Sequence, residues 1–161
     1  MNTSAPQRPG HDAFPARDDA RDDVRPVPSP PRGTETVLVV EDDELVRTLL
    51  GRTLRGLGYE AHLAATGGEA LALYQAHGAG IDAVLCDVVM PDISGPEAVR
   101  RMLDGAGREP AVIFMSGYTD HVLLNDGRLQ HASNFLQKPL MRATLAQKLR
   151  DVLDGRRERR A

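Results

Sequence analysis

Carboxylate, hydroxyl and ammonium side chains stand directly after four of the short apolar runs in this sequence. These side chains belong to Glu41, Asp42, Asp43, Asp87, Ser116 and Lys138. Carboxylates that lie close together repel one another, and a hard cation such as Mg²⁺ bound between them relieves that repulsion. A carboxylate can also attack phosphorus, while a lysine and a hydroxyl bind the charged phosphoryl oxygens. The set therefore holds the groups needed to make and break a phospho-aspartate.

Each of these residues also has a simpler structural interpretation. Asp42 and Asp43 can cap a helix, and Asp87 and Ser116 can stand in turns. Lys138 can be an ordinary surface lysine, although only two of the 20 basic residues are lysines. Their joint position after the first, third, fourth and fifth apolar runs favours one shared site.

The apolar runs predict five strands, and apolar residues at helical spacing follow them. The predicted strands are Thr36–Val40, Tyr59–Ala64, Ala83–Cys86, Ala111–Met115 and Asn134–Gln137. The predicted helices are Leu45–Leu57, Thr66 to near Gly78, Pro96–Leu103, a weak one at Leu123–Leu124, and Leu145–Leu153. This alternation predicts an α/β fold, a doubly wound five-stranded parallel sheet with helices on both faces. Ligands of such sheets bind at the carboxyl ends of the strands, where the polar residues stand.

Regional composition divides the chain of 161 residues into three parts. Residues 1–33 hold seven of the 11 prolines together with five aspartates and five arginines, which predicts a disordered arm. Residues 34–154 hold 17 acidic and 11 basic residues, a net charge of −6, and form the predicted folded domain. Residues 155–161 are predicted to form a frayed basic tail.

Charge and composition also exclude several classes of protein. A formal net charge of −3 argues against binding to nucleic acid, and a single cysteine excludes an internal disulfide and a cysteine metal cluster. No apolar run approaches the ~20 residues that span a membrane, and the amino terminus lacks an apolar signal core. We therefore expect a cytoplasmic protein that binds neither nucleic acid nor membrane.

Four motifs carry a resemblance to a known family. They are Val39–Asp43, Leu85–Gly95, Met115–Gly117 and Phe135–Pro139. In this order and spacing they resemble the receiver domain of response regulators in two-component signalling. Residues 115–120 and 135–139 are most similar to receivers attached to hybrid sensor kinases. The resemblance covers residues 34–154 and implies the (βα)5 flavodoxin-like fold.

The resemblance implies a phosphoryl site with Mg²⁺ as its cofactor. Asp87 would accept the phosphoryl group from the phosphohistidine of a histidine kinase or a histidine phosphotransfer protein. Asp42 and Asp87 would bind Mg²⁺ directly, Glu41 through water, and Val89 through its backbone carbonyl. Glu41 stands where many members of the family have aspartate, a change that should leave metal binding intact.

Further residues receive roles from the same resemblance. Ser116 would be the hydroxyl that moves toward the phosphoryl group, and Lys138 would be its charge partner. Phe135 would be the switch aromatic near the last strand, or else an ordinary core aromatic. Asp43 falls one residue past the acidic pair and is assigned to helix capping, and the Lys138–Pro139 peptide would be cis.

We predict a single-domain response regulator, because few residues follow the last predicted helix, the chain begins with Met1, and no kinase motif is present. The face formed by helix four, strand five and helix five would report phosphorylation to another protein. Asn125–Gly127 makes helix four weak, so movement there should be easy. A phosphorelay intermediate or a phosphate sink is the alternative within this class.

The alternative from a different class is an enzyme, a phosphatase with an aspartate nucleophile. Such enzymes carry Asp-x-Asp after the first strand. Glu41 and Asp43 have that spacing, but the first residue is glutamate and Asp87 stays unexplained. We therefore expect a signalling module and no enzyme, apart from the protein's own phosphoryl transfer and autodephosphorylation.

Overall fold

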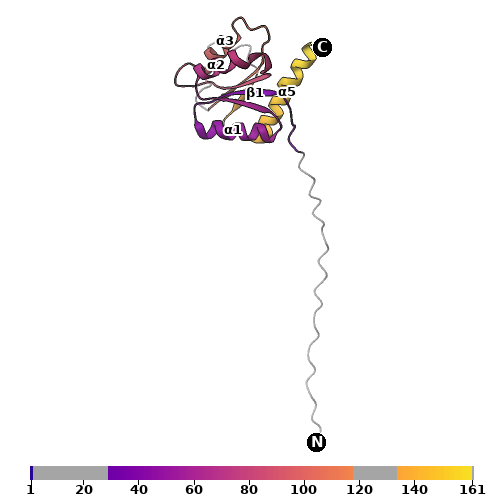
Figure 1. The fold of residues 1–161 in the computed structure, drawn as a ribbon. Helices are drawn as coiled ribbons and strands as arrows, with labels where there is room; N and C mark the ends of the chain where they lie inside the picture. The colour runs from indigo at the N-terminus through magenta and orange to yellow at the C-terminus, as the bar shows by residue number, and fades with distance from the viewer. Residues whose placement is uncertain (2–28, 118–133, 161) are drawn as a thin grey trace.

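The computed structural model describes Met1, residues 29–117 and residues 134–160, which Figure 1 draws in colour. Most of the predicted arm and the whole of the predicted fourth helix lie outside the described residues. The boundaries between arm, folded domain and basic tail therefore stay predictions.

Five strands form one parallel sheet, as the sequence predicts. They are β1 Thr36–Val40, β2 Glu60–Ala64, β3 Ala83–Asp87, β4 Ala111–Ser116 and β5 Phe135–Gln137. The order across the sheet is β2-β1-β3-β4-β5. All neighbouring strands pair in parallel, so their carboxyl ends lie along one edge. The strand order reverses between β1 and β3, which is where such sheets bind ligands.

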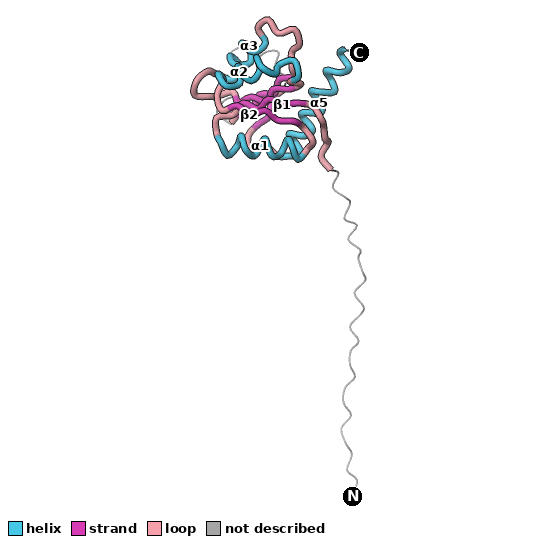
Figure 2. The backbone as a smooth tube through the Cα atoms, viewed as in Figure 1, coloured by secondary structure: helices cyan, strands magenta, loops and turns pink. Residues whose placement is uncertain are grey.

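Helices cover both faces of this sheet (Figures 1 and 2). They are α1 Glu44–Gly56, α2 Gly67–His77, α3 Gly95–Leu103 and α5 Arg142–Arg160, with a short 3₁₀ helix, η1, at Gly78–Gly80. Helices α1 and α5 pack on one face, and α2 and α3 pack on the other. In the described part of the chain, no helix combines the length and the apolar character needed to cross a membrane.

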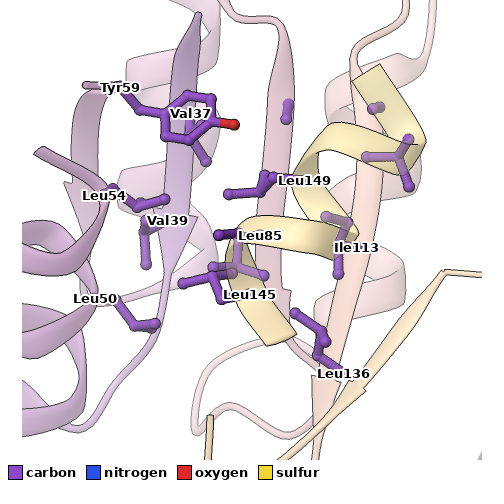
Figure 3. Close-up of a cluster of buried hydrophobic side chains, with 14 of the residues drawn as sticks. Val37, Val39, Leu50, Leu54, Tyr59, Leu85, Ile113, Leu136, Leu145 and Leu149 are labelled. Carbon is purple, nitrogen blue, oxygen red and sulfur yellow. The ribbon is translucent and has the colours of Figure 1, made fainter. Parts of the chain in front are cut away.

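The core consists of two apolar layers, one on each face of the sheet. Val37 of β1 belongs to the layer under α1 and α5, whereas its neighbour Leu38 belongs to the layer under α2 and α3. Successive residues of a strand point to opposite faces, so a strand that is covered on both sides must be apolar throughout. Figure 3 shows the first layer, to which α1 contributes Leu54 and α5 contributes Leu149.

The last helix is longer than the sequence predicts. We expected a helix at 145–153 followed by a frayed end, but α5 continues through the basic residues to Arg160. Arg150 and Arg157 stand two turns apart on α5, and both contact Glu35, at 2.7 and 2.9 Å respectively. These ion pairs give the last turns of α5 a tertiary partner that the local sequence does not reveal.

Candidate functional site

Three carboxylates meet at the carboxyl edge of the sheet. Glu41 and Asp42 follow β1, and Asp87 ends the neighbouring strand β3. Val40 pairs with Cys86 across these two strands, so the residues that come next emerge side by side. One oxygen atom of each carboxylate lies within 4.8 Å of the others. The structure thus brings together the three acids that the sequence places after these strands.

Lys138 joins this cluster from the end of β5. Its Nζ lies 2.5 Å from Asp87 Oδ2 and 2.8 Å from Glu41 Oε2. The Lys138 amide donates to the Ser116 carbonyl at 2.9 Å, which continues the pairing of β5 with β4. The Lys138–Pro139 peptide is cis, as the resemblance implies. The side chain therefore reaches across β4 to the acids at the ends of the central strands.

Burial governs the charge of these groups. Glu41 is 1% exposed, and burial, with the neighbouring charge of Asp87, raises the pKa of its carboxyl against the opposing effect of Lys138. Burial alone would lower the pKa of Lys138, but its contacts with Asp87 and Glu41 outweigh this effect and raise that pKa. The ammonium therefore stays charged, and in the described part of the site it faces three carboxylates.

This excess of negative charge fits a hard divalent cation. Glu41 Oε2 is buried and accepts no well-formed hydrogen bond from the described residues, although the Lys138 ammonium lies close to it. Asp42 adds an exposed carboxylate to the cluster. Carboxylate oxygens completed by water are the ligand set that suits Mg²⁺. The residues present therefore fit that ion.

The loop after β3 holds Asp87 in place. The amide of Val89 donates to Asp87 Oδ1 at 3.1 Å, and the amide of Gly95 donates to the Val88 carbonyl at 3.0 Å. A Cβ atom at Gly95 would overlap the carbonyl oxygen of Asp87, so only glycine allows this close approach. The sequence placed Gly95 at the end of a motif but did not reveal this contact.

Asp92 ties the same loop to the start of α2. Its two carboxylate oxygens accept hydrogen bonds from the amides of Gly67 and Gly68, at 3.1 and 3.0 Å. A backbone hydrogen bond from Ile93, together with these two, lowers the pKa of the Asp92 carboxyl. Sequence reasoning missed this role because the partners stand 25 and 24 residues away, and no local pattern links them.

The other predicted site residues lie in different settings. Ser116 ends β4 and is 2% exposed. Val89, in the loop after β3, is 48% exposed. Phe135 is half-buried and stacks on Phe114, with the two ring centroids 5.8 Å apart. The ring of Phe135 therefore belongs partly to the core and partly to the surface.

Two residues beside the cluster have structural roles. Asp43 caps α1 as predicted, because its Oδ1 accepts hydrogen bonds from the amides of Leu45 and Val46 at 2.9 and 3.0 Å. Cys86 is buried in β3, and burial, with the charges of Asp87 and Glu41, raises the pKa of its thiol. Such a thiol stays protonated and unreactive, so Cys86 acts as a core side chain.

Comparison with known families settles the class of the protein. Residues 37–150 match the family described as the response regulator receiver domain. The chain belongs to this family. The sensor kinase CckA of Brucella abortus is 36% identical to this receiver over 122 residues, which are 76% of this chain and 13% of the kinase. The chemotaxis protein CheY of Treponema pallidum is 31% identical over 118 residues, 73% of this chain and 81% of that protein.

Solved receiver structures share the fold. The receiver domain of the hybrid histidine kinase CckA is 35% identical, with a TM-score of 0.62, and the match covers 73% of this chain and 98% of that one. CheY4 of Vibrio cholerae is 32% identical, with a TM-score of 0.66, and the match covers 75% of this chain and 100% of that one. The predicted family and the predicted flavodoxin-like fold are confirmed.

Membership of the family places this receiver among the signalling modules of two-component systems. Receiver domains typically bind Mg²⁺ at an acidic site, and here Glu41, Asp42 and Asp87 form an acidic cluster. Receiver domains also interact with histidine kinases or phosphotransfer proteins.

Proposed function

We propose that this receiver domain accepts a phosphoryl group on the carboxylate of Asp87 from the phosphohistidine of a histidine kinase or a histidine phosphotransfer protein. One observation carries the proposal: Asp87 lies between the acidic pair after β1 and the ammonium of Lys138 after β5. Its Oδ1 accepts a hydrogen bond from Val89, which orients the carboxylate. A nucleophile, a place for a cation and a fixed positive charge thus meet at one carboxylate.

The transfer exchanges one bond to phosphorus for another. An oxygen of the Asp87 carboxylate attacks phosphorus, and the phosphorus–nitrogen bond of the phosphohistidine breaks. The imidazole leaves with the bonding electron pair and takes a proton from water. The Lys138 ammonium, whose pKa is raised, keeps its charge and attracts the phosphoryl oxygens. The Ser116 hydroxyl donates a hydrogen bond to the phosphoryl group of the product.

We assign Mg²⁺ to the carboxylates of Asp42 and Asp87, to Glu41 through water, and to the backbone carbonyl of Val89. When bound, the ion supplies positive charge that the phosphoryl group and the three carboxylates require together. The buried Glu41 Oε2, which accepts no well-formed hydrogen bond from the described residues, supports this assignment.

Phosphorylation adds about two negative charges at Asp87. The new acceptor oxygens favour a rearrangement of Ser116 toward them, and Phe135 pairs with Phe114, which lies on the same strand two residues before Ser116. We infer that the face formed by the predicted fourth helix, β5 and α5 carries the change to another protein. Phe135 supports this inference because it is only half-buried at that face.

Exposed apolar side chains near the cluster support a protein as the phosphoryl donor. Leu45 and Leu49 on α1 are 81% and 62% exposed, and Met141, three residues after Lys138, is 67% exposed. Beside them a groove of about 610 Å³ runs between α1 and the start of α5. Apolar surface of this kind on a described part of the domain is typical of protein contacts. A partner that covers it would bring its phosphohistidine close to Asp87.

The test is labelling by a small phosphodonor. The wild-type protein and the Asp87→Asn variant are incubated with acetyl phosphate and Mg²⁺, and their intact masses are measured. We expect one hydroxylamine-labile phosphoryl group on the wild type and none on Asp87→Asn. Labelling of Asp87→Asn at the wild-type level would overturn the assignment.

Asp43→Asn is the matched control, because asparagine also caps helices well. Asp43 neighbours the cluster and its carboxylate is occupied by two amides of α1. We expect this variant to be labelled like the wild type. Loss of labelling in Asp43→Asn, or steady turnover of phosphate esters by the wild type, would favour the phosphatase alternative instead.

A further inference from the structure

The turn that follows β1 carries four acidic residues in succession, Glu41 to Glu44. The amide of Glu41 donates to the Ala64 carbonyl at 3.0 Å and so continues the pairing of β1 with β2. Asp43 already caps α1. Between these two anchors stands Asp42, whose carboxylate has no hydrogen-bond partner among the described residues. Its direction therefore depends on how the backbone of the turn is held.

Arg47 holds this backbone at three successive carbonyls. Its Nη1 donates to the Glu41 carbonyl at 2.8 Å and to the Asp42 carbonyl at 3.0 Å. Its own amide donates to the Asp43 carbonyl at 2.8 Å, within the first turn of α1. The side chain is half-buried, so water competes only partly for its bond to the Glu41 carbonyl. Arg47 thus ties the carbonyl groups of three successive residues of the acidic turn to the start of α1.

The two cations near the cluster divide their partners. Lys138 contacts the carboxylates of Glu41 and Asp87. Arg47 contacts carbonyl oxygens alone among the described residues, so it brings positive charge to the turn without occupying a carboxylate oxygen. The carboxylate oxygens of Asp42 are therefore left to bind something else.

We propose that Arg47 is a positioning residue for the Mg²⁺ site: it fixes the peptides of Glu41 and Asp42 so that both carboxylates face Asp87. This inference rests on the metal assignment of the proposed function. Removal of a group that orients metal ligands without touching the metal typically lowers metal affinity by about 10-fold to 100-fold. Without Arg47 the turn would sample orientations in which the Asp42 carboxylate points away, and part of the binding free energy would be lost.

The test measures Mg²⁺ affinity directly. Mg²⁺ is titrated calorimetrically into the wild type, Arg47→Ala and Arg47→Lys, all unphosphorylated. We expect the dissociation constant to rise about 10-fold in Arg47→Ala. A lysine ammonium can still donate to one carbonyl, so the dissociation constant of Arg47→Lys should lie between those of the wild type and Arg47→Ala. Arg47→Lys also keeps the inference testable if Arg47→Ala fails to fold.

Arg52→Ala is the matched control, because Arg52 stands exposed on the same helix and forms no hydrogen bond or ion pair with the described residues of the acidic turn. We expect Arg52→Ala to bind Mg²⁺ like the wild type. Labelling by acetyl phosphate gives a second readout: Arg47→Ala should be slow at low Mg²⁺ and should recover at saturating Mg²⁺. A merely structural role would leave it slow at both.

Two results would overturn the inference. One is an unchanged Mg²⁺ dissociation constant in Arg47→Ala, and the other is an equal loss of affinity in Arg52→Ala. In both cases a wild type that binds Mg²⁺ and is labelled at Asp87 leaves the proposed function standing. Failure of the wild type itself to bind Mg²⁺ would instead overturn the metal assignment, and Arg47 with it.

Discussion

The two ends of β1 each bury a glutamate beside cationic side chains, and they do so differently. Glu35 precedes the strand and is 8% exposed, and Glu41 follows it and is 1% exposed. Glu35 pairs with two guanidinium groups, those of Arg150 and Arg157. At the other end Glu41 shares the Lys138 ammonium with Asp87. At the Glu35 end two cations face the Glu35 carboxylate, whereas at the Glu41 end one cation faces two carboxylates.

The carboxyl pKa values follow this difference in charge. Burial raises the pKa of Glu35, but the hydrogen bonds from Arg150 and from the backbone outweigh burial and lower it. Burial of Glu41 is opposed by Lys138 alone among the cations and the pKa stays raised. The Arg150 guanidinium also lies 5.7 Å from the centre of the Tyr59 ring. The carboxylate at the amino end of the strand is thus neutralised by guanidinium groups, whereas the carboxylates at the carboxyl end carry more negative charge than the Lys138 ammonium balances.

The largest effect is expected from breaking the ion pair of Glu35. Replacing Arg150 by methionine leaves the buried carboxylate with one cationic partner, the exposed Arg157, and a change of this kind destabilises by about 3 kcal/mol. Urea unfolding monitored by circular dichroism measures the loss. Arg157→Ala is the control, because that side chain is 68% exposed and its pair should contribute less than about 1 kcal/mol. An equal loss of unfolding free energy in Arg150→Met and Arg157→Ala would contradict the expectation that the buried Arg150 is the main partner of Glu35.

The opposite sign is expected at the other end of the strand. Ionised Glu41 is unfavourable in the fold, as its raised pKa shows, so Glu41→Gln should raise the melting temperature in the absence of Mg²⁺. Mg²⁺ at 100 times its dissociation constant should stabilise the wild type by about 2.7 kcal/mol and the variant by less. Thermal melts with and without Mg²⁺ measure both effects. Glu44→Gln, at an exposed acid in the first turn of α1, should keep the full Mg²⁺ effect.

The smallest effect concerns the pH dependence of unfolding. The pKa of Glu35 in the folded protein lies below its ordinary value of 4.5, so its stabilising effect is complete above that pH. The effect is lost as the pH falls through the lowered pKa. The free energy of unfolding of Glu35→Gln should therefore lie below that of the wild type at neutral pH, and the two should converge in acid. A difference that stays constant from neutral to acid pH would contradict this.

Much of the fold and part of the site follow from local sequence patterns. Apolar runs mark the strands because both faces of the sheet are covered. Asp43 and Thr66 cap their helices as predicted, since a cap joins a side chain to an amide two or three residues along. The meeting of Glu41 with Asp87 was predictable as well, because parallel strands bring their carboxyl ends to one edge.

Contacts between distant segments were not predictable from those patterns. Asp92 bonds the amides at the start of α2, and Gly95 must lack a Cβ to approach Asp87. Arg47 is close in sequence to the acidic turn, yet helical periodicity says only that it stands on α1. Such roles depend on which distant atoms the side chain reaches in the folded protein, whereas a residue pattern indicates only the element on which the residue stands.

The sequence by itself determined the order of the elements, the apolar layers and the acids at the strand ends. These depend on continuous apolar runs, on helical periodicity and on which residues directly follow each run. Tertiary structure decided which cation meets which acid. Glu35 and Arg150 stand 115 residues apart and Asp87 and Lys138 stand 51 apart. Helix packing and strand order bring these distant residues into contact. As a result, Glu35 at one end of β1 pairs with two guanidinium groups, whereas Glu41 at the other end shares one ammonium with Asp87.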